Sequence, residues 1–256
     1  MRVNYHTHTY RCTHASGSEE DYVKSAIASK LSIIGISDHI AYPDDRSSNR
    51  MMYSEVDAYI NECFRLRNKY KKDIKILVGF ESEYSDDCHP YYEYLFNEYK
   101  IDYLVFGQHY FIEDGKFYNS FDLTSTKDYI IYAKSVAKAL KTNYFKIFAH
   151  PDLVFINNLA FDDNCRQAIE ILIAAIKESG IIIEFNANGI RRGLKDFPDG
   201  QRLTYPHMEF WKRVQEENIK TIISSDCHMP EQMWDYAMDD AYIKAEELKL
   251  NLVYEI

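Results

Sequence analysis

The chain has 256 residues, 46% of them hydrophobic, which is enough for a sizeable core. Its formal net charge of −10 opposes non-specific binding to nucleic acid, whose backbone attracts a basic surface. No apolar stretch approaches the roughly 18 residues of a transmembrane helix, and the five cysteines are odd in number and form no CxxC pair. We therefore expect a protein of the reducing cytoplasm that does not cross a membrane and does not bind nucleic acid.

Short apolar runs of strand length alternate with longer segments of helical period along the chain. The runs are rich in Ile, Val and Phe and are apolar on both faces, which is typical of buried parallel strands. They occupy residues 2–5, 31–37, 74–80, 103–106, 145–149, 181–185 and 221–223. Helices are predicted from near Ser18, which precedes three acidic residues, and over 55–72, 91–99, 125–141, 162–179, 206–217 and 239–248.

Seven strand–helix units predict an α/β fold, either a closed barrel or a doubly wound sheet. The sequence contains no internal repeat, low-complexity tract or Pro/Gly-rich linker, so residues 1–256 are expected to form a single domain. Gly180 is expected to end the helix over 162–179.

Side chains of the metal-ligand type follow the predicted strands. They are His6, His8, His39, Glu81, His109, His150, Asp226 and His228, with His14 in the loop after the first strand. In a parallel barrel the carboxyl ends of the strands form one rim, where active sites lie, so we expect these side chains to surround one site. His6 and His8 are two residues apart and point to the same face of an extended strand, as do Asp226 and His228.

Imidazole and carboxylate ligands without thiolate suit Zn, Fe or Mn. Nine candidates exceed a single tetrahedral site, so two or three divalent ions are predicted, with a carboxylate such as Glu81 bridging a pair. Sites with several metals clamp the attacking and leaving oxygens of phosphoryl transfer. The pattern therefore predicts a metal-dependent phosphoesterase.

The motifs resemble those of the PHP family (polymerase and histidinol phosphatase), and within it the single-domain histidinol-phosphatase branch, over nearly the whole chain. The resemblance is carried by His6-x-His8 with His14, Ser37-Asp38-His39, Gly79-Phe80-Glu81-x-Glu83-Tyr84, Gly107-Gln108-His109, His150-Pro151-Asp152-Leu153 and Ser225-Asp226-Cys227-His228. It implies a distorted seven-stranded (β/α) barrel with the metal site at the C-terminal rim of the strands. It also implies three ions, held by His6, His8, Glu81 and Asp226, by Glu81, His109 and His150, and by His14, His39 and His228.

The segment 186–192 is similar to the stretch of that branch in which an arginine meets the substrate phosphate. Arg191 is the best match and Arg192 is its neighbour. After Val154 the branch would have a basic residue, but this chain has Phe155. Either another group supplies that contact or the substrate differs.

The resemblance implies a small phosphorylated substrate, with L-histidinol phosphate first, hydrolysed to L-histidinol and phosphate in histidine biosynthesis. A hydroxide bridging two metals would attack phosphorus in line with the leaving oxygen, and Arg191 would bind a phosphate oxygen. Asp226 could accept the proton of the attacking water, and His228 or His39 could guide a proton to the departing alcohol.

Three alternatives stay open. The first is a phosphoesterase of the same family that acts on nucleotides, sugar phosphates or phosphotyrosine, which Phe155 motivates. The second is a metal-binding module without turnover, and the third is an exonuclease or polymerase-associated module, which the negative charge and the lack of a further domain weaken. Asp38 and Asp152 are expected to orient the neighbouring ligands, Glu184 to form a structural ion pair, and residues 42–52 to form a lid.

Overall fold

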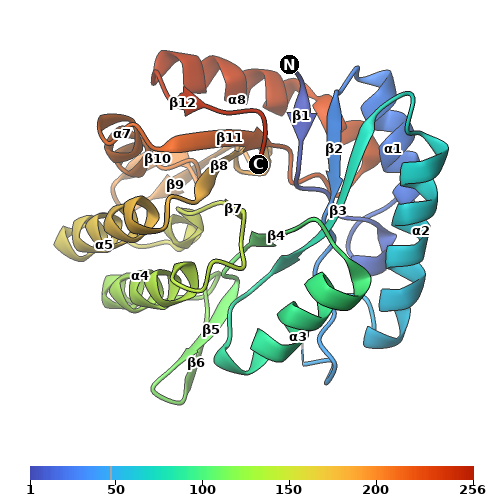
Figure 1. Cartoon of the computed structure of the whole chain (residues 1–256). Helices are drawn as coiled ribbons and strands as arrows, with labels where there is room; N and C mark the ends of the chain where they lie inside the picture. Colours follow the sequence, from blue (N-terminus) through green and yellow to red (C-terminus); the bar gives the residue numbers. More distant parts are fainter. Residues whose placement is uncertain (47) are drawn as a thin grey trace.

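The computed structural model describes residues 1–46 and 48–256. Within these residues, a parallel sheet of eight strands curls into a barrel that is surrounded by helices (Figure 1). The strands lie in the spatial order β1 (Val3–Asn4), β2 (Ile33–Ile36), β3 (Lys75–Ser82), β4 (Tyr103–Phe106), β7 (Ile147–Phe148), β8 (Ile182–Asn186), β11 (Lys220–Ser224) and β12 (Asn251–Leu252). The first seven are the strands predicted from the sequence, and the distorted α/β barrel is confirmed.

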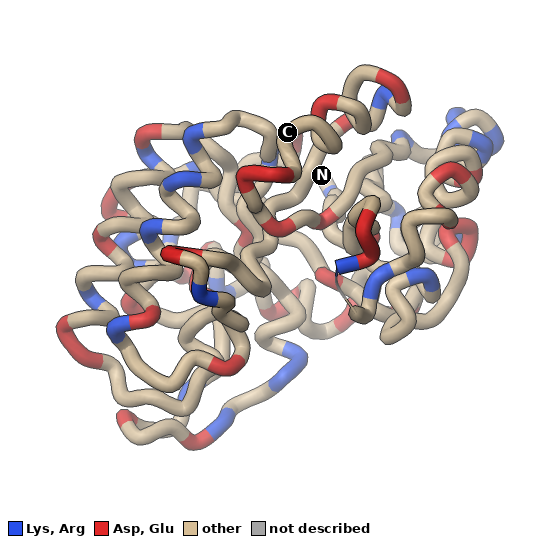
Figure 2. Tube along the Cα trace, turned by 90° about the horizontal axis from the view of Figure 1, so that it is seen from below, with Lys and Arg blue, Asp and Glu red and all other residues tan. Residues whose placement is uncertain are grey.

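The barrel closes between β1 and β11, at the carboxyl ends of these strands. Thr7 and Cys227 form a parallel bridge there, and the backbone N–H of His8 donates to the carbonyl of Cys227 over 3.0 Å. At the opposite end, β12 pairs with the start of β11, and the Tyr5 hydroxyl donates to the carbonyl of Tyr254. The C-terminal segment therefore fills the gap between the first and last strands of the barrel. The two chain ends lie close together (Figures 1 and 2).

The helices form from the local signals that the sequence carries. They are α1 (Glu19–Ala28), α2 (Val56–Lys69), α3 (His89–Tyr94), α4 (Thr126–Leu140), α5 (Asp163–Ser179), α6 (Ala187–Arg191), α7 (Met208–Glu216) and α8 (Tyr236–Glu247). Ser18 and Asp21 make a capping box at the start of α1, and Gly180, with a φ of 67°, ends α5 as predicted. Only the short α6 was not predicted.

Successive side chains of each strand point alternately to the helices and to the barrel interior. Leu104 and Phe106 of β4 belong to the large core under the helices, whereas Tyr103 and Val105 belong to the small core inside the barrel. The Tyr103 ring needs the glycine at position 35, because a Cβ there would lie 1.9 Å from its hydroxyl oxygen. That hydroxyl donates to the carbonyl of Tyr5 and ties β4 to β1 across the interior.

Two antiparallel hairpins are additions that the sequence patterns did not predict. The first pairs β5 (Tyr110–Glu113) with β6 (Lys116–Asn119), and the second pairs β9 (Leu194–Phe197) with β10 (Gly200–Leu203). The β5–β6 hairpin protrudes from the barrel (Figure 1). Both hairpins leave the carboxyl-terminal side of the sheet and so build on the rim.

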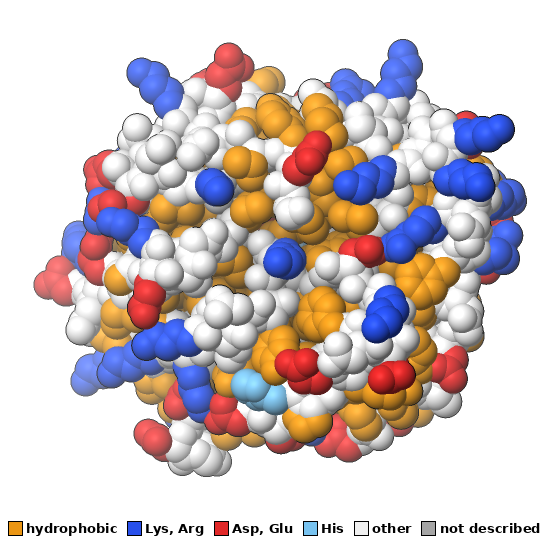
Figure 3. All heavy atoms as spheres, viewed as in Figure 1, with side chains coloured by type: hydrophobic (Ala, Val, Ile, Leu, Met, Phe, Trp, Pro, Cys, Tyr) orange, Lys and Arg blue, Asp and Glu red, His pale blue; other side chains and the backbone are white. Residues whose placement is uncertain are grey.

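Acidic and basic residues are interspersed along the outer helices (Figure 2). On the face shown in Figure 3, Lys and Arg lie scattered among acidic and apolar side chains and do not gather into one basic patch. Among the helices described, none has both the length and the apolar character that a membrane crossing requires.

Candidate metal centre and substrate pocket

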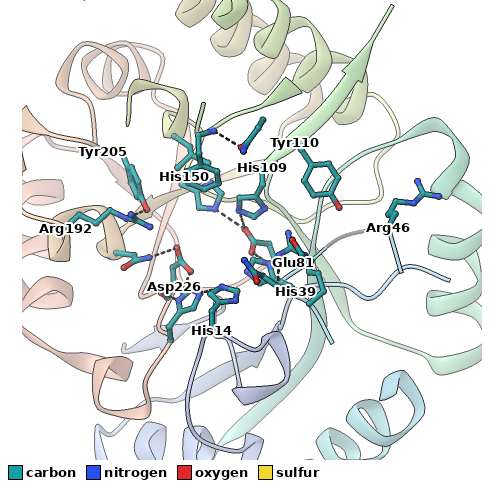
Figure 4. A pocket seen from close by; sticks show the side chains of 18 of the residues that line it. His14, His39, Arg46, Glu81, His109, Tyr110, His150, Arg192, Tyr205 and Asp226 are labelled. Atoms are coloured by element: carbon teal, nitrogen blue, oxygen red, sulfur yellow. Dashed lines mark hydrogen bonds and ion pairs between the residues drawn. The ribbon is translucent and has the colours of Figure 1, made fainter. Parts of the chain in front are cut away.

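A cavity of about 610 Å³ opens at the carboxyl ends of the strands, within the size range of small-molecule sites. All nine ligand residues predicted from the sequence come together here. Seven of them line the cavity, namely His14, His39, Glu81, His109, His150, Asp226 and His228. His6 and His8 are fully buried against Glu81 and Asp226. Figure 4 shows the cluster at the centre of the pocket.

The Glu81 carboxylate lies at the middle of the cluster and is divided between two pairs of histidines. Its Oε2 lies 3.3 Å from His6 Nε2 and 3.5 Å from His8 Nε2. Its Oε1 lies 3.3 Å from His109 Nε2 and 3.0 Å from His150 Nε2. This is the arrangement needed for one carboxylate to bridge two ions. Gly107 allows it, because a Cβ at that position would lie 2.1 Å from Glu81 Oε1.

Asp226 completes the first predicted set. Its Oδ1 lies 3.1 Å from His8 Nε2 and 3.6 Å from His6 Nε2. Its Oδ2 accepts hydrogen bonds from the side-chain amides of Asn186 and Asn188. Oδ1 of Asp226 therefore faces the histidines, whereas Oδ2 is held by the two asparagines at and just after the end of β8.

The third predicted set lies beside the first. His14 Nε2 is 3.1 Å from His228 Nε2, and the His14 and His39 rings stack with centroids 5.3 Å apart. His39 also faces the central carboxylate, with its Nδ1 2.9 Å from Glu81 Oε2. His39 thus links this set to the bridging residue.

The protein atoms alone leave this cluster incompletely paired. Glu81 Oε2 and His39 Nδ1 are buried and lie 2.9 Å apart, but they do not meet in hydrogen-bond geometry and have no other hydrogen-bond partner among the described residues. Leaving such atoms unpaired is costly without a cation. His6 Nε2 and His8 Nε2 lie 3.0 Å apart and face the same two carboxylates. Imidazole nitrogens and carboxylate oxygens arranged in this way fit divalent ions.

The electrostatics agree with this interpretation. Burial alone would raise the pKa of Glu81, yet His109, His6 and His39 hold it well below its usual range. Burial would likewise raise the pKa of Asp226, but His6, His8 and His228 hold it well below its usual range. The neighbouring histidines thus favour the ionised form of both carboxylates, which is the form that binds a divalent cation.

A second group of acidic residues orients the ligands from behind. Glu184 accepts from His6 Nδ1 at 2.9 Å, and Glu83 accepts from His109 Nδ1 at 2.8 Å. Such contacts fix the tautomer and leave Nε2 available for an ion. The ion pair expected of Glu184 is present, and its partner is the predicted ligand His6.

The two aspartates that were expected to orient ligands differ from each other. Asp38 accepts from the backbone N–H groups of Thr9 and His39 and lies 3.6 Å from His8 Nδ1. Asp152 accepts instead from the backbone N–H of His207 and from Trp211 Nε1. Asp152 therefore anchors the start of α7, and the described contacts do not join it to His150.

Arg191 and Arg192, which follow β8 at the end of α6, have opposite orientations. Arg192 lines the cavity, its Nε donates to the Tyr205 hydroxyl, and no carboxylate pairs with it among the described residues. Arg191, preferred from the sequence as the phosphate contact, does not line the cavity. It binds Asp235 and both the carbonyl and the hydroxyl of Ser225. Its guanidinium is occupied, so the geometry corrects the sequence preference from Arg191 to Arg192.

Phe155 also lies outside the cavity wall. Its ring packs against Tyr129, Phe161 and His207, with centroid distances of 4.5 to 5.9 Å. The departure from the expected basic residue is therefore a change within an aromatic cluster. Any further positive charge at the pocket must come from another segment.

Two further segments complete the cavity wall, the unpredicted β5–β6 hairpin and the loop after β2 in which a lid was expected. The β5–β6 hairpin and the residues after it contribute Tyr110, Phe117, Asn119 and Phe121, and the loop after β2 contributes Arg46, Ser48, Asn49 and Arg50. The Phe121 ring stacks on the ring of His109 at an interplanar angle of 9°. Figure 4 shows Arg192 and Tyr205 on one side of the cluster and Tyr110 and Arg46 on the other.

Residues 4–188 match the family model described as PHP domain. A protein named probable histidinol-phosphatase from Deinococcus radiodurans is 24% identical over 234 residues, which are 88% of this chain and 85% of that protein. The histidinol-phosphatase of Bacillus subtilis is 21% identical over 254 residues, which are 87% of this chain and 92% of that protein. Among solved structures, the histidinol phosphate phosphatase of Lactococcus lactis complexed with Zn, L-histidinol and phosphate has a similar fold. Its TM-score is 0.72 at 14% identity, over 98% of this chain and 95% of that one.

Proposed function

The chain belongs to the PHP domain family, and we propose that it is a metal-dependent phosphomonoester hydrolase whose substrate is L-histidinol phosphate. The observation that carries the proposal is the division of the Glu81 carboxylate between two pairs of histidine nitrogens. Two relatives that match most of this chain bear the name histidinol-phosphatase, which supports this substrate.

The residues suggest three ion positions. His6, His8, Glu81 and Asp226 would hold one ion, Glu81, His109 and His150 a second, and His14, His39 and His228 a third. Zn, Mn and Fe all suit these ligands. Divalent ions in such a site lower the pKa of bound water and offset the negative charge of a phosphoryl group.

The chain's own residues bind and orient the substrate. Arg192 reaches the cavity without a carboxylate partner among the described residues, so it would bind phosphate oxygens with its unoccupied N–H groups. Asp226 Oδ1 would accept the proton of the attacking water, while the Asn186 and Asn188 amides hold Oδ2. His228 or His39 would guide a proton to the departing alcohol.

The alcohol part of the substrate would occupy the side of the cavity away from Arg192. Tyr110, Phe117 and Phe121 lie in that wall, and aromatic side chains stack well on a flat ring such as imidazole. Asn119 lies in the same wall and offers an amide for hydrogen bonding.

The test is phosphate release from L-histidinol phosphate by protein loaded with Mn or Zn, beside a panel of other phosphomonoesters and a chelated control. A strong, chelator-sensitive preference for L-histidinol phosphate is expected. Activity on other esters alone would retain the metal chemistry and reject the substrate. No activity on any ester, with metals bound, would favour a binding module without turnover.

One observation favours a second candidate, an ester whose alcohol carries no amino group. The carboxylates among the described lining residues are Glu81 and Asp226, and both belong to the predicted ligand sets. The described wall therefore offers no further carboxylate for the ammonium group of histidinol. The same panel separates the two candidates if it includes the analogue of L-histidinol phosphate that lacks the amino group.

A further inference from the structure

Glu83 is a buried carboxylate that holds two positively charged or polar groups through a single oxygen. Its Oε1 lies 2.8 Å from His109 Nδ1 and 2.5 Å from Arg50 Nη2. The Tyr42 hydroxyl donates to its Oε2 over 3.2 Å. With 2% of the residue exposed, Glu83 depends on these contacts in place of water.

Arg50 reaches Glu83 from the loop after β2, the segment expected to act as a lid. The Arg50 side chain is 9% exposed and lines the substrate cavity. Its Nη1 donates to the carbonyl of Asn49, and its Nε has no hydrogen-bond partner among the described residues. The ion pair with Glu83 is therefore the contact that fixes this guanidinium at the pocket wall.

The chain of contacts continues to the predicted metal centre. Glu83 Oε1 accepts from His109 Nδ1, which leaves Nε2 as the free ligand atom. That Nε2 lies 3.3 Å from Glu81 Oε1, the oxygen that also faces His150. Arg50 and His109 share the same oxygen of Glu83, so loss of the guanidinium would leave the carboxylate free to turn away from His109.

We propose that Arg50 is a positioning residue for the metal centre, which acts through Glu83 to hold His109 with its Nε2 directed at the ion shared with Glu81 and His150. The inference rests on the metal dependence of the proposed function but not on the identity of the substrate. Under this proposal, the loop after β2 supports metal binding and also forms part of the cavity wall.

Arg46 provides a matched control within the same loop and the same cavity. Its guanidinium pairs with Asp44 at 2.8 Å and with Asp87 at 2.6 Å. Neither aspartate contacts a predicted ligand in the described structure. Replacing Arg46 therefore removes a loop anchor and a pocket charge without interrupting the contacts that lead to His109.

The experiment is an equilibrium titration of metal-free protein with Mn²⁺ at buffered free concentrations, in which bound Mn²⁺ is counted and no substrate is present. Arg50→Gln and Glu83→Gln are each expected to require about 10- to 100-fold more free Mn²⁺ for full occupancy. The double variant should require no more free Mn²⁺ than the single variant that binds Mn²⁺ less tightly, because both changes break the same chain of contacts. Arg50→Lys keeps the charge and should recover part of the loss.

Three results would overturn the proposal. The first is an Arg50→Gln protein whose affinity for Mn²⁺ is within about twofold of that of the unaltered chain. The second is an Arg46→Gln protein that loses as much Mn²⁺ affinity as Arg50→Gln. The third is a double variant whose loss of Mn²⁺ affinity is the full sum of the two single losses. Thermal unfolding of the metal-free variants monitors the fold, and Arg50→Lys with Glu83→Gln carries the test if Arg50→Gln does not fold. Because no turnover is measured, a failed phosphatase assay and a failed positioning role are separate outcomes.

Discussion

Arg191 and Asp235 are joined by a two-point ion pair, with Arg191 Nε 2.6 Å from Asp235 Oδ2 and Nη2 3.2 Å from Oδ1. Asp235 in turn caps α8 by accepting from the N–H groups of Ala237 and Met238. Only 8% of the Arg191 side chain is exposed. The pair therefore joins the end of α6 to the start of α8.

Arg191→Ala is expected to lower the free energy of unfolding by about 3 kcal/mol, because it leaves Asp235 largely buried without its cation. Urea unfolding of metal-free protein measures the change. Arg192→Ala is the matched control, since Arg192 has no carboxylate partner among the described residues, and it should cost less than about 1 kcal/mol. Equal losses in the two variants would contradict the structural role of Arg191.

Arg192→Ala is expected to reduce kcat/KM for a phosphomonoester by about 100-fold, because it removes a charged donor from the phosphate. Metal content should stay unchanged, since Arg192 contacts no predicted ligand in the described structure. Arg192→Lys should recover only part of the activity, because lysine cannot donate bidentately. A variant with full activity would exclude phosphate binding by this residue.

Glu81→Gln is expected to cause the largest loss of bound metal among single ligand substitutions, because Glu81 contacts two histidine pairs with its two oxygens. Metal analysis after dialysis against a weak chelator measures the loss. His14→Ala is the comparison, since His14 belongs only to the third predicted set. If both variants lost the same amount of metal, Glu81 would not be a bridge.

His207 should contribute a pH-dependent stability. Burial is the main cause that lowers its pKa from 6.5 to about 4, and the Arg202 guanidinium lowers it further. An unfolded histidine therefore takes up its proton at higher pH than the folded one, so the stability due to His207 is complete above pH 6.5 and is lost as the pH falls toward 4. The loss amounts to about 3 kcal/mol at most.

The readout is the difference in unfolding free energy between the unaltered chain and His207→Gln, both metal-free, across this pH range. The difference is needed because burial raises the pKa of Asp152 to about 6, which changes stability in the opposite direction over nearly the same range. A difference that does not vary with pH would show that His207 titrates normally in the folded protein.

The sequence predicts the barrel and the ligand cluster because both depend on repeated local signals. Buried parallel strands appear as short apolar runs, and their shared direction places His39, Glu81 and His109 on one rim. The orientation of Arg191 and Arg192 is not a local property. Arg191 is the last residue of the short α6 and Arg192 follows it. The contacts of Arg191 with Ser225 and with Asp235, 44 residues later, turn it away from the cavity.

The hairpins were missed for a different reason. β5 and β6 are short and largely exposed, and each carries a charged residue at one end, so they lack the longer apolar run of most of the buried strands. The Asp114-Gly115 turn between them is a strong hairpin signal and could have revealed them. The contact of Arg50 with Glu83 joins residues 33 apart through a loop, and no periodicity records it.

The closure of the barrel between β1 and β11 has a consequence for how the protein acquires its ions. His6 and Asp226, both in the first predicted set, are separated by 220 positions, so the ribosome exposes them roughly 10 to 40 s apart at 5–20 residues per second. During that interval the nascent chain offers histidines without the closing carboxylate. With this predicted ligand set, full-affinity loading of the ion would have to wait until Asp226 has been synthesised and the barrel has closed.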